Sequence, residues 1–99
     1  MTTVQISDDA LADLNDGHGF YEAQEPGLGD YFTSCLRSDI EGLKVSAGIH
    51  PVGYRDYHRI LSRVFPFGIF YTMEDEVAVV WAVVDLRRDP EWIRDHLSK

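Results

Sequence analysis

The first half of the chain has apolar residues at helical spacing. An alternating stretch at residues 4–6 predicts a short strand, and Ser7 followed by two aspartates is typical of a helix N-cap. From Asp8 onward, apolar positions recur with a period near 3.5, which predicts a helix whose buried face carries Leu11, Leu14, His18 and Tyr21. Because glycine disfavours a helix interior, the stretch DGHG at residues 16–19 predicts a break in this helix.

A second helix is expected after the turn EPGLG at residues 25–29. Pro26 ends the first helix, and Gly27 can adopt a positive φ. The apolar residues that follow fall on one helical face, namely Leu28, Phe32, Cys35, Leu36, Ile40 and Leu43. We therefore expect two helices in an antiparallel hairpin.

In the second half, the period changes from 3.6 to 2. Three strands are predicted, at residues 57–65, 68–73 and 77–84, with an acidic turn at 74–76. The last strand is apolar on both faces, so it should lie inside the sheet, and Tyr71 and Trp81 should be core aromatics. Asp89 and Pro90 then predict the N-cap and first position of a terminal helix.

This order of elements, β-α-α-β-β-β-α, predicts an α+β fold in which a small, mainly antiparallel sheet packs on a helical hairpin. With 99 residues, the chain is expected to be a single domain, residues 1–99. Its apolar stretches are far shorter than the roughly 20 residues of a membrane helix. The N-terminus has no basic and apolar signal segment, and the single Cys35 is expected to be a core residue, so we expect a cytoplasmic protein.

Charge is distributed unevenly along the chain, whose formal net charge is -8. Residues 1–43 contain nine acidic side chains and one basic side chain, Arg37, whereas residues 44–99 contain eight of each sign. Such a chain repels polyanions at long range, so nucleic-acid binding would require a concentrated basic patch. That patch could be built only from Arg55, Arg59, Arg63, Arg87, Arg88 and Arg94.

Three stretches of the sequence resemble a known family. They are FYEAQEPGLGDYF at residues 20–32, RILSRVFPFGIFYTMEDEVAVVWAV at 59–83, and RRDPEW at 87–92. In this order and spacing, the chain from about Leu11 to Trp92 resembles the RelE/ParE superfamily of type II toxin-antitoxin toxins, also called plasmid stabilization proteins. The resemblance implies a toxin that an antitoxin encoded beside it neutralises. It leaves the target open, because some members cleave mRNA on the ribosome and others poison DNA gyrase.

The resemblance also indicates which residues to compare with the ribonuclease branch. That branch has basic residues on its second strand, an arginine at the start of the third strand and another after the fourth. Arg59 and Arg88 match two of these positions, whereas Leu61 and Gly68 stand where two other basic residues would be. The tyrosine or histidine that the branch has near its C-terminus has no tyrosine counterpart after Tyr71.

Proton-transfer groups are correspondingly scarce. RNA cleavage through the 2'-hydroxyl requires a base and an acid, and arginine stays protonated at neutral pH. His58 and His96 are the candidates for this role, although histidines more often serve in packing. His18 and His50 have no partner at metal-ligand spacing, so we expect no metal and no cofactor.

Asp85 occupies the position where many family members have a histidine before the closing arginines. Its carboxylate could hold Arg87 or Arg88, which would weaken a phosphate clamp there. One interpretation therefore makes the arginines a solvated rim, paired with acids such as Asp89 and Glu91. The other makes them contacts for an antitoxin or target, and its candidate residues are Arg59, Arg63, Arg87, Arg88 and Trp92.

Three functions from different classes stay open at this point. The first, which we favour, is a ParE-like toxin that inhibits a protein target such as DNA gyrase. The second is a RelE-like, metal-independent, ribosome-dependent endoribonuclease with Arg59, Arg88 and His58 as catalytic candidates. The third is a non-toxic relative that only binds its partner. Exposed sheet edges and the apolar side chains of the terminal helix also suggest a homodimer or an antitoxin complex.

Overall fold

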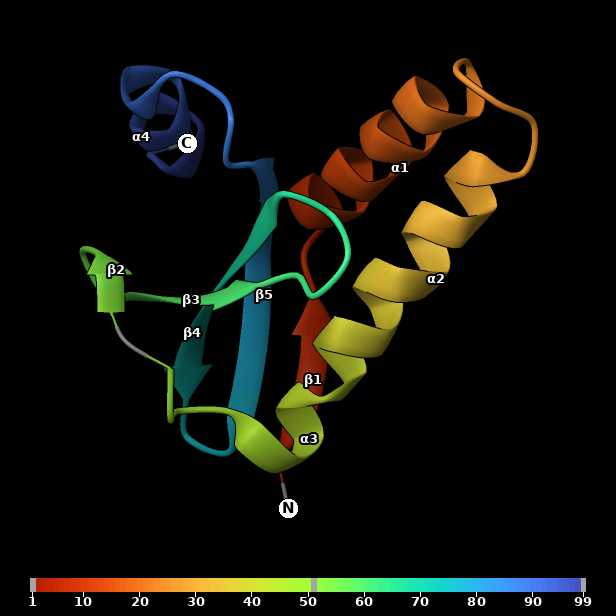
Figure 1. Ribbon diagram of the computed structural model, residues 1–99. Coiled ribbons are helices and arrows are strands. Elements are labelled where there is room, and N and C mark those ends of the chain that lie inside the picture. The colour runs from red at the N-terminus through yellow and green to blue at the C-terminus, as the bar shows by residue number, and fades with distance from the viewer. Residues whose placement is uncertain (1, 51, 99) are drawn as a thin grey trace.

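The computed structural model describes residues 2–50 and 52–98 of the chain (Figure 1). The elements follow in the order β1 (Thr3–Ile6), α1 (Asp8–Glu22), α2 (Leu28–Glu41), α3 (Leu43–Ser46), β2 (Val52–Tyr54), β3 (Tyr57–Leu61), β4 (Phe67–Glu74), β5 (Val77–Asp85) and α4 (Pro90–Leu97). This confirms the predicted α+β order and adds a one-turn helix, α3, and a short strand, β2. Within the described residues, no helix is long and apolar enough to span a membrane.

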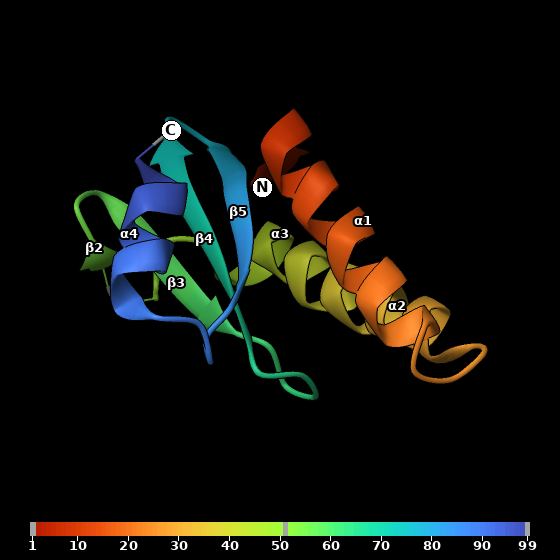
Figure 2. The ribbon, with the colours of Figure 1, turned by 90° about the horizontal axis from the view of Figure 1, so that it is seen from above.

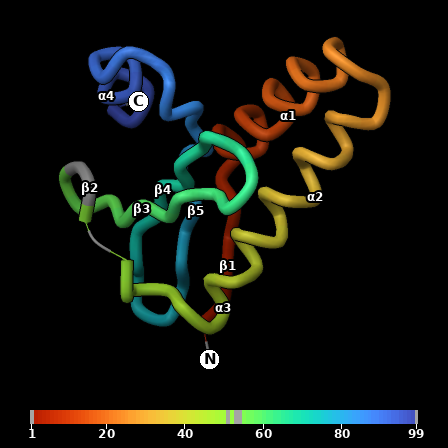
Figure 3. The backbone as a smooth tube through the Cα atoms, viewed as in Figure 1, coloured from red at the N-terminus to blue at the C-terminus, as the bar shows by residue number. Residues whose placement is uncertain are grey.

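The strands form one sheet in the order β1-β5-β4-β3-β2. Strands β2 to β5 pair antiparallel, while β1 pairs parallel with β5. The mainly antiparallel sheet and the interior position of β5 are thus as predicted. The tube in Figure 3 shows how the chain returns from the hairpin through α3 before it enters β2.

The helices cover both faces of the sheet. Seen from above, α1 and α2 lie on one side and α4 on the other (Figure 2). The main core lies under the hairpin and includes Leu14, Phe32, Leu36, Ile69 and Tyr71. A smaller core lies under α4 and is formed by Phe70, Ala82, Val84 and Leu97.

A bulge in β5 explains one wrong prediction. Phe70 pairs with Ala82 and Tyr71 with Val80, so Trp81 has no opposite residue in β4. An extra residue in a strand turns its side chain out of the regular alternation. Trp81 is consequently 38% exposed, whereas Tyr71 is fully buried as predicted.

Helix α1 is continuous through residues 16–19, so the predicted break there is wrong. The reason is packing: a Cβ on Gly17 would lie 2.5 Å from ring atoms of Phe32 in α2. Gly17 therefore allows the two helices to approach each other closely. The turn that follows is as predicted, because Gly27 has a φ of 90°.

The predicted strand at residues 57–65 is too long, since β3 ends at Leu61. Beyond that residue, the chain turns toward α2, where Ser62 Oγ donates a hydrogen bond to Asp39 at 3.0 Å. Arg63 Nε donates to the other oxygen of the same carboxylate, also at 3.0 Å. Phe65 then packs between the aromatic rings of Tyr21 and Phe32, which gives this loop a place in the core.

Two glycines of α1 provide a matched test of this packing. We expect Gly17→Ala to lower the free energy of unfolding by about 1–3 kcal/mol, because the new methyl group collides with Phe32. Gly19→Ala meets nothing within 4 Å, so it should raise the free energy of unfolding by about 0.5–1 kcal/mol through helix propensity. Urea unfolding of both variants measures the difference, and equal effects would contradict the close helix contact.

Candidate functional site

A groove lies between α4 and the face of the sheet that carries the smaller core. Its volume is about 310 Å³, and its lining residues are Arg59, Phe70, Leu86, Arg88, Pro90, Ile93, Arg94 and Leu97. Arg59 comes from β3, Arg88 from the connection between β5 and α4, and Arg94 from α4 itself. We call this feature the arginine groove. It combines three cations with an apolar floor.

The three arginines of the groove lie outside the salt bridges that hold several other cationic side chains. Among residues 2–50 and 52–98, Arg63 pairs with Asp39, Arg87 with Asp85, and Lys44 with Glu41. The salt bridges of this part of the chain include neither Arg59, Arg88 nor Arg94. The arginine groove therefore holds cationic groups that no acid of the described residues neutralises by direct contact.

Asp85 binds Arg87 rather than Arg88. Arg87 donates from Nε to Oδ1 at 3.0 Å and from a terminal nitrogen to Oδ2 at 2.8 Å. The Arg87 guanidinium lowers the pKa of Asp85, chiefly through these hydrogen bonds. Arg88 instead places its guanidinium 4.2 Å above the ring of Trp92, which leaves its donors available at the groove.

The sequence-predicted candidates are only partly brought together. Arg59 and Arg88 line the same groove, and Trp92 lies beside Arg88. Arg63 lies elsewhere, against α2, and both it and Arg87 are held by an acid. Arg94 joins the groove, although its sequence context had offered no motif for it. The sequence had indicated Arg94 only as one of six arginines that could build a basic patch.

His58 faces away from the groove, although it adjoins Arg59 in the chain. Neighbouring residues of a strand point to opposite faces, and the His58 ring stacks on Tyr71 at a centroid distance of 5.1 Å. Its Nδ1 donates to the carbonyl oxygen of His50 at 2.7 Å. The His50 ring in turn hydrogen-bonds the Tyr71 hydroxyl at 2.7 Å, and burial lowers the pKa of His50.

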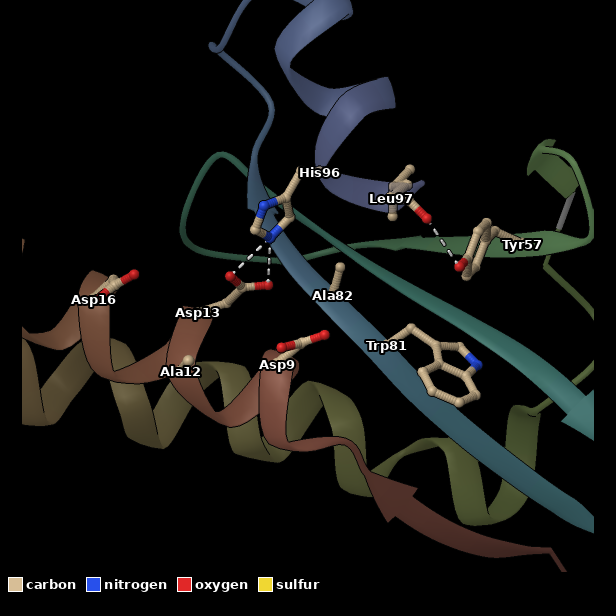
Figure 4. A pocket seen from close by; sticks show the side chains of 9 residues that line it. All are labelled: Asp9, Ala12, Asp13, Asp16, Tyr57, Trp81, Ala82, His96 and Leu97. Carbon is tan, nitrogen blue, oxygen red and sulfur yellow. Dashed lines mark hydrogen bonds and ion pairs between the residues drawn. The ribbon is translucent and has the colours of Figure 1, made fainter. Parts of the chain in front are cut away.

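Sequence reasoning missed the partner of His96. His96 Nε2 donates to the carboxylate of Asp13, with distances of 2.8 and 3.1 Å to its two oxygens (Figure 4). The same carboxylate accepts the backbone N–H of Val83 at 2.9 Å. Burial raises the pKa of Asp13, and these hydrogen bonds partly offset that effect. The pair is separated by 83 residues, so no local motif could reveal it.

His96 lines two other cavities, which lie on the α1 side of α4. One is the cavity of Figure 4, about 160 Å³, bordered by Asp9, Asp16 and Trp81. The other is a cleft of about 190 Å³ that Arg88 also lines. The ring of His96 stacks on the ring of Trp92, with centroids 4.8 Å apart, so the two aromatic side chains lie one after the other along α4.

One cluster of three side chains has the spacing of metal ligands. Ligand atoms of His18, Glu22 and Asp30 lie within 4.8 Å of one another. However, the Glu22 carboxylate already accepts backbone N–H groups of Gly27 and Gly29 at 2.9–3.1 Å. Through these bonds Glu22 caps the start of α2. The glutamate of the stretch YEAQEPGLG thus has a structural role in the turn between α1 and α2.

The Asp85–Arg87 pair yields a pH-dependent prediction. The pKa of Asp85 is lower in the folded protein than its ordinary value of 3.8, so the ionised group stabilises the fold above about pH 4. This contribution is lost as the pH falls through the folded-state value. Asp85→Asn should therefore cost about 0.5–1 kcal/mol at pH 7, a small figure because solvent screens the pair, and less than that at pH 3. Thermal unfolding at both pH values, with Glu25→Gln as an exposed control, tests this expectation.

Comparisons with known proteins identify the fold. A chain of the chromosomal ParDE TA system from P. aeruginosa matches with a TM-score of 0.77 and 14% identity, over 84% of this chain and 94% of that one. The intact E. coli RelBE toxin-antitoxin complex contains a chain that matches with a TM-score of 0.62 and 18% identity, over 89% of this chain and 100% of its own length. The isolated E. coli RelE toxin matches with a TM-score of 0.63 and 17% identity, over 99% and 98%. No protein-family model and no curated protein sequence matches the chain. The chain has the fold of the RelE/ParE superfamily.

Proposed function

We propose that this protein is the toxin of a type II toxin-antitoxin system. In this proposal it acts in the cytoplasm as a ParE-like toxin, binds and inhibits a protein target such as DNA gyrase, and is neutralised by a cognate antitoxin. The fold supports the general assignment, because it is shared with chains of ParDE and RelBE systems. The arginine groove is the observation that carries the binding function.

The chemistry of the groove suits a protein segment. Arg59, Arg88 and Arg94 can bind carboxylates through paired hydrogen bonds, while Phe70 and Ile93 offer apolar contact between them. An acidic segment with interspersed aliphatic residues would satisfy both. Such a segment would also bring negative charge to the arginine groove. Within residues 2–50 and 52–98, the salt bridges include none of the three arginines of this groove.

Two features favour binding over RNA cleavage. The lining of the groove contains no side chain that exchanges protons near neutral pH, since His58 faces the opposite side of the sheet. In addition, Leu61 and Gly68 are paired across β3 and β4, two positions along the ladder from the pair of Arg59 and Phe70. Positions two apart on a strand share a face, so Leu61 and Gly68 add no cation to the sheet face that carries Arg59.

One observation favours the RelE-like endoribonuclease as a second candidate. Arg88 lines both the arginine groove and the cleft that His96 also lines. A phosphate held by Arg88 would therefore have a histidine within the neighbouring cleft, and that histidine is oriented by a carboxylate.

Induced expression in a bacterial host separates these candidates. Growth, RNA integrity and nucleoid shape would be scored with and without the neighbouring reading frame. Arrest with intact mRNA and a disturbed nucleoid, relieved by the neighbour, would support the ParE-like function. Arrest with cleaved mRNA would support the endoribonuclease, and absence of arrest would contradict both.

Variants of the groove test the binding surface directly. We expect Arg59→Ala and Arg88→Ala each to weaken antitoxin binding roughly 10-fold or more, because each removes charge-assisted hydrogen bonds. Arg63→Ala is the matched control, since Arg63 is held by Asp39 outside the groove and its loss should change affinity less than about 2-fold. Calorimetric titration with the purified neighbour provides the measurement, and equal losses for all three variants would argue against the groove.

A further inference from the structure

We propose that the cleft between α1 and α4 is an anchor pocket for one large apolar side chain of the partner segment. This inference rests on the proposed function, because it concerns the same segment whose carboxylates bind the arginine groove. The cleft has a volume of about 190 Å³, which is enough for one side chain and too small for a folded element. Below, it is called the α1–α4 cleft.

Two aromatic side chains in the wall of the cleft are exposed. Phe20, from the last turns of α1, is 55% exposed, and Trp92, from α4, is 38% exposed. Phe67 and Val84 also line the cleft. Exposed aromatic rings that border a small, partly apolar depression are typical of sites where a partner inserts an anchoring residue.

Three of the charged or titratable groups that line the cleft already have protein partners. Asp13 is bound to His96 and to the backbone of Val83, and Asp85 is bound to Arg87. An apolar occupant would therefore displace water from charged groups that keep their hydrogen bonds to the protein. A cationic occupant, by contrast, would have only Asp16 as an acid outside these pairs. These pairings favour an apolar side chain over a cationic one.

Arg88 connects the cleft to the arginine groove, since it lines both. A segment that places a carboxylate on Arg88 therefore has its neighbouring side chains at the mouth of the α1–α4 cleft. In an extended segment, residues advance about 3.3 Å each, so the apolar residue should lie within about two positions of that acid. The partner is thus specified as an acidic segment with a bulky apolar residue beside one acid.

Peptide probes can test this specification. Two blocked eight-residue peptides would carry the same three glutamates and differ only at one central position, phenylalanine or alanine. Binding would be followed by the fluorescence of Trp92 in the Trp81→Phe protein, which leaves Trp92 as the remaining tryptophan. We expect the phenylalanine peptide to bind about 10-fold more tightly and to shift Trp92 emission to shorter wavelength, because burial of a large apolar side chain is favourable.

Variants then assign the gain to the cleft. Phe20→Ala should abolish most of the 10-fold preference while leaving the alanine peptide's affinity unchanged. Tyr31→Ala is the matched control, because Tyr31 is 52% exposed, comparable to Phe20, but does not line the cleft. The preference should persist in that variant.

The outcomes separate the two proposals. If the alanine peptide binds in a manner that depends on Arg59 and the phenylalanine peptide binds no better, the anchor pocket is wrong and the proposed function stands. A preference that survives Phe20→Ala would also overturn the pocket. If neither peptide binds at millimolar concentration, the acidic partner itself is contradicted, and the anchor pocket falls with it.

Discussion

The carboxylate of Asp13 is the point at which three elements of this protein are joined. Strand β1 pairs with β5 only as far as Val80, so the edge of β5 beyond that residue has no neighbouring strand. Helix α1 covers this edge, and Asp13 accepts the N–H of Val83, which no neighbouring strand pairs. A buried N–H without a partner would cost about 1–3 kcal/mol. Because the same carboxylate binds His96, it also determines where α4 lies.

The position of α4 in turn creates both surfaces that matter for function. On one side of the helix, Ile93 and Leu97 contact the smaller core and leave the arginine groove beside it. On the other side, Trp92 faces α1 across the α1–α4 cleft. An isolated helix of eight residues is unstable in water. Its few buried side chains and the Asp13–His96 pair therefore determine the shape of both surfaces.

The pairing of charges explains why the arginine groove is positively charged in an acidic chain. The helical hairpin carries most of the excess negative charge, and Lys44, Arg63 and Arg87 each form a salt bridge with an acid. Asp85 illustrates this, since it neutralises Arg87 but leaves Arg88 on Trp92. A single carboxylate thereby divides two adjacent arginines into one that forms a salt bridge and one that does not. The proposed binding site depends on that division.

The sequence alone determined the order of elements, the interior strand and the capped terminal helix, because these follow from local periodicity and from residues adjacent in the chain. It also identified Arg59 and Arg88, through their resemblance to a family pattern. Only the tertiary structure decided how far β3 extends, where the bulge turns Trp81 outward, and which arginine Asp85 binds. The Asp13–His96 pair and the contribution of Arg94 likewise emerged only in the fold. Each of these features depends on contacts between distant segments or on side-chain geometry. Such contacts and geometry produce no regular pattern of apolar and polar residues in the sequence.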